Sequence, residues 1–411
     1  MRVTTPAPTD RADYSQADLA DPRLYTSGDA HLIWQSLRTA EPVFWHEHPG
    51  EGFWVVTQRA DAQRVLRDHQ DFTSAGGTSI AMLGCPDPAA GLMMQASDPP
   101  RHQRLREQIG QPLSPHAISR HAETVRSIVT QALEPIADGG IWDAAAALSQ
   151  VPMAVAASLM GLPEADVGPL MRMSFATLAP LDPLYRTGSE QQTLAAAHSG
   201  IMEYFADRLA ERRRRPTSDL ISHLLAIEVE GRRLNQQELL LNCLSLIVGW
   251  VVTTSQAVSA TIQALPGQRG GEGTWPTSVP VDSVVEEALR WSSPVTHFMR
   301  RARRAVELHG KNIGAGDAVT AWIASGNRDE TVFGQPYLFD AERRPNRHMA
   351  FGSGPHRCIG APLARMMLRL MFHELFKQIE SFEPAGTPTH LVSNQIAGIT
   401  SLPIQVNPRL G

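Results

Sequence analysis

The sequence predicts a mainly α-helical protein with small β-sheets, an α+β fold in one domain. Apolar residues recur at helical spacing, with short breaks, from about Ile118 to Leu225. After Asn235 comes a run of roughly 30 residues that is apolar on nearly every side, which indicates a long buried helix. The strand-like segments are short, and no change of composition divides the 411 residues into separate units.

The composition excludes several classes of protein. The net charge of -5 gives no sign of nucleic-acid binding. The three cysteines, Cys85, Cys243 and Cys358, are too few and too scattered for a disulfide framework and fit a reducing cytoplasm. Residues 1–6 are polar and begin no apolar run of signal-peptide or membrane length. We therefore expect a soluble, cytoplasmic protein without membrane or nucleic-acid partners, in which a flexible arm (residues 1–20) precedes one domain (21–411).

The first hundred residues combine short helices with a hairpin. Two β-rich runs, 42–45 and 52–57, are separated by a His/Pro/Gly turn and predict a β-hairpin. Short helices are expected on either side of it, at 31–39 and 60–68. Residues 74–97 form a long irregular stretch, and a loop of that length in a compact domain is usually functional or mobile.

The rest of the chain reads as helices with two interruptions. The Pro- and Leu-rich segment 176–188 separates two helices, and the Gly- and Pro-rich segment 266–280 is expected to be a loop. Asn235 and Glu238 have the spacing of a capping box at the start of the long apolar helix. A further helix is predicted over 281–291.

The segment Phe351-Gly-Ser-Gly-Pro-His-Arg-Cys358-Ile-Gly-Ala-Pro362 is the most informative part of the chain. Its glycines let the main chain approach a flat ligand closely. Apolar residues at helical spacing predict a helix from Pro362 to about Lys377. A cysteine at a helix N-terminus favours the thiolate, because free N–H groups and the helix dipole stabilise negative charge there. A buried structural cysteine is the alternative interpretation of these residues alone.

The pattern Phe-Gly-x-Gly-x-His-x-Cys-x-Gly resembles the haem-binding loop of the cytochromes P450. The resemblance implies a single triangular P450 fold with the long helix crossing over the haem. It implies haem b (iron protoporphyrin IX) as cofactor, with Cys358 as the axial thiolate ligand of the iron. The loop residues Phe351, His356 and Gly360 would contact this cofactor. Because the chain resembles the soluble bacterial type, we expect a ferredoxin and a ferredoxin reductase as electron donors.

Other motifs resemble the same family and occur in the family's order. His102 and Arg106 lie four residues apart on one helix face, where the family clamps the haem propionates. Arg300 is placed like another propionate ligand. Taken alone, the first pair is an ordinary solvated basic face. A buried structural network that braces the haem loop is implied at three charged residues, Glu287, Arg290 and Arg343.

The middle of the long helix departs from the family. Most P450s carry there a glycine, an acid and an alcohol, and the last two relay protons during dioxygen activation. Here the glycine is Gly249, but the ungapped match places Val251 at the acid position and Val252 at the alcohol position. A slip of one residue, through a local bulge, would place Thr253 at the alcohol position instead.

Three functions are compatible with this departure. In the first, the substrate and ordered water supply the proton relay, and the enzyme is an oxidase or monooxygenase of secondary metabolism. It would act on a small natural product, by hydroxylation or by radical C–C or C–N coupling of an aromatic amino-acid-derived compound such as an indole diketopiperazine. The alternatives are a peroxide-using enzyme and a haem-thiolate isomerase or dehydratase, besides a non-catalytic haem binder. The sequence does not separate a free substrate from one tethered to a carrier.

Two sets of residues are candidates for contacts with substrate or partner. An acidic ferredoxin has a plausible dock in the basic cluster Arg347-His348 and His356-Arg357, for which an ordinary solvated patch is the alternative. The substrate pocket is expected to take polar residues from loops, each of which is also compatible with an ordinary loop role, and one residue beside the helix glycine. These are Thr78, Ser79, Gln95, Val248, Thr296, His297, Gln395 and Thr400.

Overall fold

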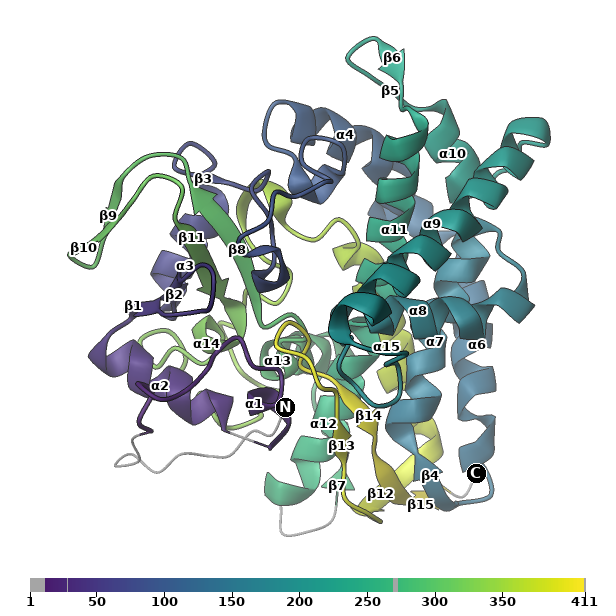
Figure 1. Cartoon of the computed structure of the whole chain (residues 1–411). Helices are drawn as coiled ribbons and strands as arrows, with labels where there is room; N and C mark the ends of the chain where they lie inside the picture. The colour runs from purple at the N-terminus through teal and green to yellow at the C-terminus, as the bar shows by residue number, and fades with distance from the viewer. Residues whose placement is uncertain (1–11, 28, 269–272, 410–411) are drawn as a thin grey trace.

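The computed structural model of the chain describes residues 12–27, 29–268 and 273–409. A large helical part and a smaller part built around a sheet lie side by side (Figure 1). The longer helices are α2 (Ala30–Ala40), α3 (Arg59–Arg67), α4 (Arg101–Gly110), α6 (Ala122–Leu133), α7 (Ala144–Met160), α8 (Val167–Leu178), α9 (Glu190–Arg214), α11 (Gln236–Val251), α12 (Thr254–Gln268), α13 (Val281–Ser292) and α15 (Ala361–Gln378). Short helices are α1 (Leu24–Ser27), α5 (Pro115–Ser119), α10 (Leu220–Ala226) and α14 (Ile323–Gly326). The structure thus confirms the mainly helical prediction.

The main sheet has five strands in the order β1-β2-β11-β8-β3. The hairpin predicted near the N-terminus is its edge, because β1 and β2 pair antiparallel, and β2 then pairs parallel with β11. A second sheet has the order β4-β15-β12-β7. The strands of both sheets are β1 (Val43–His46), β2 (Phe53–Val56), β3 (Phe72–Thr73), β8 (His297–Ala302), β11 (Ala318–Trp322), β4 (Gly140–Asp143), β7 (Gly273–Thr274), β12 (Ile379–Pro384) and β15 (Pro403–Pro408).

The predicted long central helix is present but interrupted. It begins with the expected capping box, in which Asn235 Oδ1 accepts from the Glu238 N–H at 2.9 Å and Glu238 Oε2 accepts from the Asn235 N–H at 2.7 Å. The stretch from Gln236 to Gly267 is long and apolar enough to span a membrane, yet 61% of its most apolar window is buried inside the protein, and it crosses the helical part as a core element (Figure 1). A turn at Val252 and Thr253 separates α11 from α12.

Two expectations about the chain's organisation need correction. Leu19 is buried and its carbonyl accepts from the Tyr25 hydroxyl at 2.7 Å, so the packed fold begins before residue 21; residues 1–11 of the expected arm lie outside the described part. Pro266 belongs to α12 instead of opening a loop, since a helix that already packs on α13 and α15 tolerates it near its end. Residues 269–272 of that expected loop are not among the described residues.

Candidate active site

The cysteine loop has the geometry that its glycines predict. Gly352 and Gly354 have φ of +72° and +71°, a region that side chains disfavour. At Gly354 a Cβ would also lie 2.7 Å from the Arg67 Cα, so the close approach of α3 requires glycine. The Cys358 N–H donates to the Phe351 carbonyl at 2.8 Å, which closes the loop just before α15 begins.

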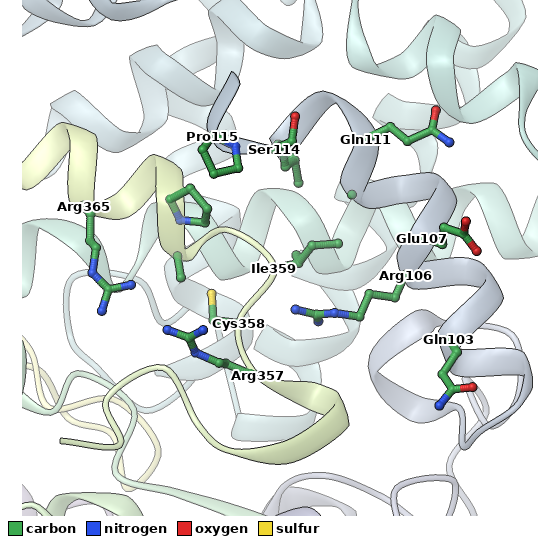
Figure 2. A pocket seen from close by; sticks show the side chains of 14 residues that line it. Gln103, Arg106, Glu107, Gln111, Ser114, Pro115, Arg357, Cys358, Ile359 and Arg365 are labelled. Atoms are coloured by element: carbon green, nitrogen blue, oxygen red, sulfur yellow. The ribbon is translucent and has the colours of Figure 1, made fainter. Parts of the chain in front are cut away.

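Cys358 lines a cavity of about 560 Å³ between α4 and the start of α15 (Figure 2). Figure 2 shows Arg106 extending from α4 toward the cysteine loop, and Arg357 beside the thiol. Desolvation by the surrounding protein raises the pKa of the Cys358 thiol, whereas the N–H groups of Gly360 and Ala361 and the Arg106 guanidinium act in the opposite direction. A metal ion bound at the sulfur favours the thiolate further, because metal binding displaces the thiol proton.

Four basic groups converge beside this loop, and the Asp98 carboxylate acts on two of them, His102 and Arg300, through its charge alone. The rings of His102, on α4, and His356 are 3.9 Å apart between centroids, and both ring nitrogens of buried His102 have no hydrogen-bond partner. Arg300, on β8, is buried and donates to the Met299 carbonyl at 2.7 Å. Within the described part of the chain, no carboxylate forms an ion pair with these three residues or with Arg106.

Their pKa values give the same picture. Desolvation, followed by the charge of Arg106, lowers the pKa of His102 to about 4. Desolvation and the charge of Arg300 lower the pKa of His356 to about 2, and desolvation lowers that of Arg300 itself to about 10. Buried cationic groups are stable only when paired. The residues therefore fit a ligand that brings two carboxylates, as the haem propionates would.

The structural network predicted at Glu287 is present and fully buried. Arg290 donates to both carboxylate oxygens of Glu287 at 2.8 and 2.7 Å, and Arg343 Nε lies 3.2 Å from Oε2. The Asp340 N–H and the Asn346 amide complete the set at 2.8 and 3.0 Å. The network ties α13 to the segment that leads into the cysteine loop.

A second brace, at Glu286, was not predicted. Arg365, on α15, donates to both of its oxygens at 2.6 and 2.8 Å, and His348 Nε2 lies 3.0 Å from Oε2. The Arg365 guanidinium also lies 4.6 Å from the centre of the Phe351 ring. Burial alone would raise the pKa of Glu286, but these hydrogen bonds outweigh it and lower the pKa to about 2. The only signal in the sequence was an acidic pair on α13 and an arginine early in α15. Such a combination is too common to indicate an ion pair.

Across from the cysteine, one face of the central helix is accessible. Ser245, Val248, Gly249 and Thr253 keep accessible surface on a helix that is otherwise largely buried. A Cβ on Gly249 would meet nothing within 4 Å, so there is open space beside it. The Thr253 hydroxyl donates to the Gly249 carbonyl at 3.1 Å.

The two valines next to this face point elsewhere. Val251 and Val252, the residues that the ungapped match places at the acid and alcohol positions, both have 0% exposure and belong to the main core cluster. Their side chains therefore contact neighbouring helices, not the open space beside Gly249.

The structure separates the candidate pocket residues into two groups. Thr296 and His297 are fully buried and bonded to each other, with the Thr296 hydroxyl on the Asn394 carbonyl and the His297 ring against Trp322. The Thr400 hydroxyl donates to the Thr389 carbonyl within a small hairpin. Like Thr400, the others keep accessible surface: Ser79 bonds to Gln395, Gln95 accepts from Ser245 of α11 at 2.8 Å, and the Thr78 carbonyl accepts from the Met299 N–H of β8.

The proposed basic dock needs correction. The His348 side chain is buried against Glu286 and the His356 ring packs on His102. Only Arg347 and Arg357 of that cluster are exposed. Each histidine side chain turns inward because a polar group inside the protein takes the place of solvent beside its ring.

Comparison with known proteins decides the family. The cytochrome P450 family model matches residues 280–407. The chain is 32% identical to cytochrome P450 NovI of Streptomyces niveus, over 96% of this chain and 97% of the relative. The chain belongs to the cytochrome P450 family. Linalool 8-monooxygenase of Pseudomonas putida is 31% identical, over 95% of this chain and 99% of that P450. The crystal structure of P450 OxyD, involved in the biosynthesis of vancomycin-type antibiotics, superposes with a TM-score of 0.84 at 32% identity, over 95% of this chain and 100% of that one.

The chain is therefore a P450 monooxygenase, an oxidoreductase that uses haem and acts on natural products or other small molecules. Like other bacterial P450s it works with external redox partners. When bound, the haem would supply dioxygen activation, and Cys358 would hold its iron as a thiolate, a ligand that favours O–O cleavage. Three features of the site fit this cofactor: the cysteine loop, the four basic groups without an ion pair, and the space beside Gly249.

Proposed function

We propose that this P450 oxidises a small natural product with a proton relay in which Thr253 is the alcohol and no protein acid takes part. The acidic member is instead a polar group of the substrate or an ordered water. Protons are thus delivered from the substrate side of Gly249.

The hydrogen bond from Thr253 to the Gly249 carbonyl carries this proposal. It holds the only hydroxyl among residues 249–253 beside the space that Gly249 leaves open. The turn at Val252–Thr253 supplies the slip that brings Thr253 there, while both valines are directed into the core. An apolar side chain cannot move a proton, so the relay needs a further donor from outside the helix.

A substrate that provides this donor carries an N–H or O–H group close to the reacting carbon. Aromatic amino-acid-derived compounds such as indole diketopiperazines have such groups, and radical C–C or C–N coupling is a reaction open to them. The likeness to a P450 involved in the biosynthesis of vancomycin-type antibiotics supports a natural product as substrate. The accessible amides of Gln95 and Gln395 are the side chains we assign to its recognition.

We also propose a cytoplasmic location, with electrons from a ferredoxin and its reductase. The cavity on the Cys358 side is lined by three arginines, Arg106, Arg357 and Arg365, and by one acid, Glu107. Charge complementarity to an acidic ferredoxin favours this face over the cluster around Arg347.

A reconstituted system tests the proposal. A Trp-containing cyclic dipeptide should give a type I spectral shift and an oxidised or coupled product that requires both dioxygen and reduced ferredoxin. The N-methylated analogue should bind but give less product per electron consumed. Neither shift nor product with the cyclic dipeptide would remove this substrate class, and a shift only with the same unit loaded on a carrier would indicate a tethered substrate. Product formed from peroxide alone, or without dioxygen, would instead favour the peroxide-using or isomerase function.

A further inference from the structure

The side chain of Trp250 joins the central helix to the cysteine loop. A Cβ placed on Gly360 would lie 2.9 Å from the indole Nε1 and 3.8 Å from the Cys358 sulfur. The N–H edge of the indole and the sulfur therefore flank the same glycine. No larger residue at position 360 leaves the indole where it is.

The indole N–H has no acceptor among the residues that the structure describes. Trp250 is only 6% exposed, and no carbonyl or side chain accepts a hydrogen bond from its Nε1. The N–H edge itself keeps a little accessible surface, and the indole N–H of a side chain this buried usually has a partner. The sulfur of Cys358 is already approached by the backbone N–H groups of Gly360 and Ala361, so this is a place where donors gather.

We infer that the Trp250 N–H donates a hydrogen bond to the Cys358 thiolate in the haem-bound enzyme. A thiolate is a charged acceptor, and hydrogen bonds to charged acceptors are strong. Each donor withdraws electron density from the sulfur and so weakens its donation to the iron. Trp250 is thereby a positioning residue that tunes the iron ligand; the inference depends on Cys358 as ligand and not on the substrate or on the role of Thr253.

Trp250→Phe tests this by removing the N–H while keeping an aromatic ring. The iron–sulfur stretch in the resonance Raman spectrum should move to higher frequency and the reduction potential to a more negative value. Trp275→Phe is the matched control. The Trp275 Nε1 likewise has no partner among the described residues, but it is fully buried and its ring packs against Phe372, Phe376 and Phe382. That variant should change neither quantity.

Gly360→Ala provides a second route should Trp250→Phe bind haem poorly. The added Cβ pushes the indole away from the sulfur, so this variant should shift both quantities in the same direction. In a double-mutant cycle, Gly360→Ala should add little once Trp250 is Phe, because both changes remove one interaction. Additive shifts, or a Trp250→Phe enzyme that matches the Trp275→Phe control in frequency and potential, would overturn the inference.

Discussion

Glu286 and Glu287 each receive an arginine from another segment on the cysteine side of the molecule, Arg365 and Arg343, and both carboxylate oxygens of buried Glu287 are paired. On the opposite side, one threonine hydroxyl bonded to its own helix stands beside an open space at Gly249. The first side is held by charged groups in fixed geometry. The second has few constraints of its own.

The contrast divides the chemistry between the two sides. The braced side fixes the sulfur ligand and the cofactor, which are common to the whole family. On our proposal, the open side decides which substrate enters and how protons reach the reaction. Changes on the cysteine side should therefore cost cofactor and stability, and changes on the other side should cost product yield with the cofactor retained.

The largest effect is expected from Cys358→Ala. Without the sulfur ligand the reduced carbon monoxide complex should lose its red-shifted Soret band completely. Cys243→Ala, at a buried cysteine far from the loop in sequence and without a polar role, should keep the band. An unchanged band in Cys358→Ala would remove the assignment of the ligand.

The second largest effect is expected from Glu287→Gln. The substitution leaves Arg290 and Arg343 without their carboxylate in a buried site, which typically costs about 3–5 kcal/mol. We expect a matching fall in the free energy of unfolding, measured with denaturant, together with loss of haem. The control is Asp282→Asn, which removes an exposed ion pair with Arg369 and should cost about 0–1 kcal/mol. Equal losses in the two variants would contradict the view that this side is rigidly braced.

The brace at Glu286 should make stability depend on pH. Its folded-state pKa of about 2 lies below the ordinary value of 4.5, so its stabilisation is complete above about pH 5 and is lost as the pH falls from 4.5 toward 2. Glu286→Gln should cost on the order of 1–2 kcal/mol at pH 7 after allowance for partial exposure. The gap from wild type in unfolding free energy should narrow by pH 3, whereas Glu342→Gln, at an exposed residue, should show no such gap. A gap independent of pH would assign the effect to packing.

The sequence predicted the cysteine side of the site more completely than the side around Gly249. The cysteine loop, His102 with Arg106, and the Glu287 network were predictable because charged and glycine residues at fixed spacings have one structural use. The choice between Val252 and Thr253 stayed open in the sequence, because hydrophobic periodicity does not register the turn at residues 252–253 that interrupts the helix. The inward orientation of His348 was missed for a related reason: its burial depends on Glu286, a partner that is distant in sequence. For His356 the sequence left both a cofactor contact and a surface dock open, and its ring packs on His102.

The most direct test of the division is the yield of product per electron in Thr253→Val. The change removes the hydroxyl and nearly preserves shape. We expect the Soret band of the reduced carbon monoxide complex to be unchanged and product per electron to fall roughly a hundredfold, at the low end of what proton-transfer groups contribute. Thr261→Val is the control, because Thr261 makes the same bond to the carbonyl four residues earlier, at 2.8 Å, but is buried. A Thr253→Val enzyme as productive as the Thr261→Val control would show that protons reach the reaction without this hydroxyl.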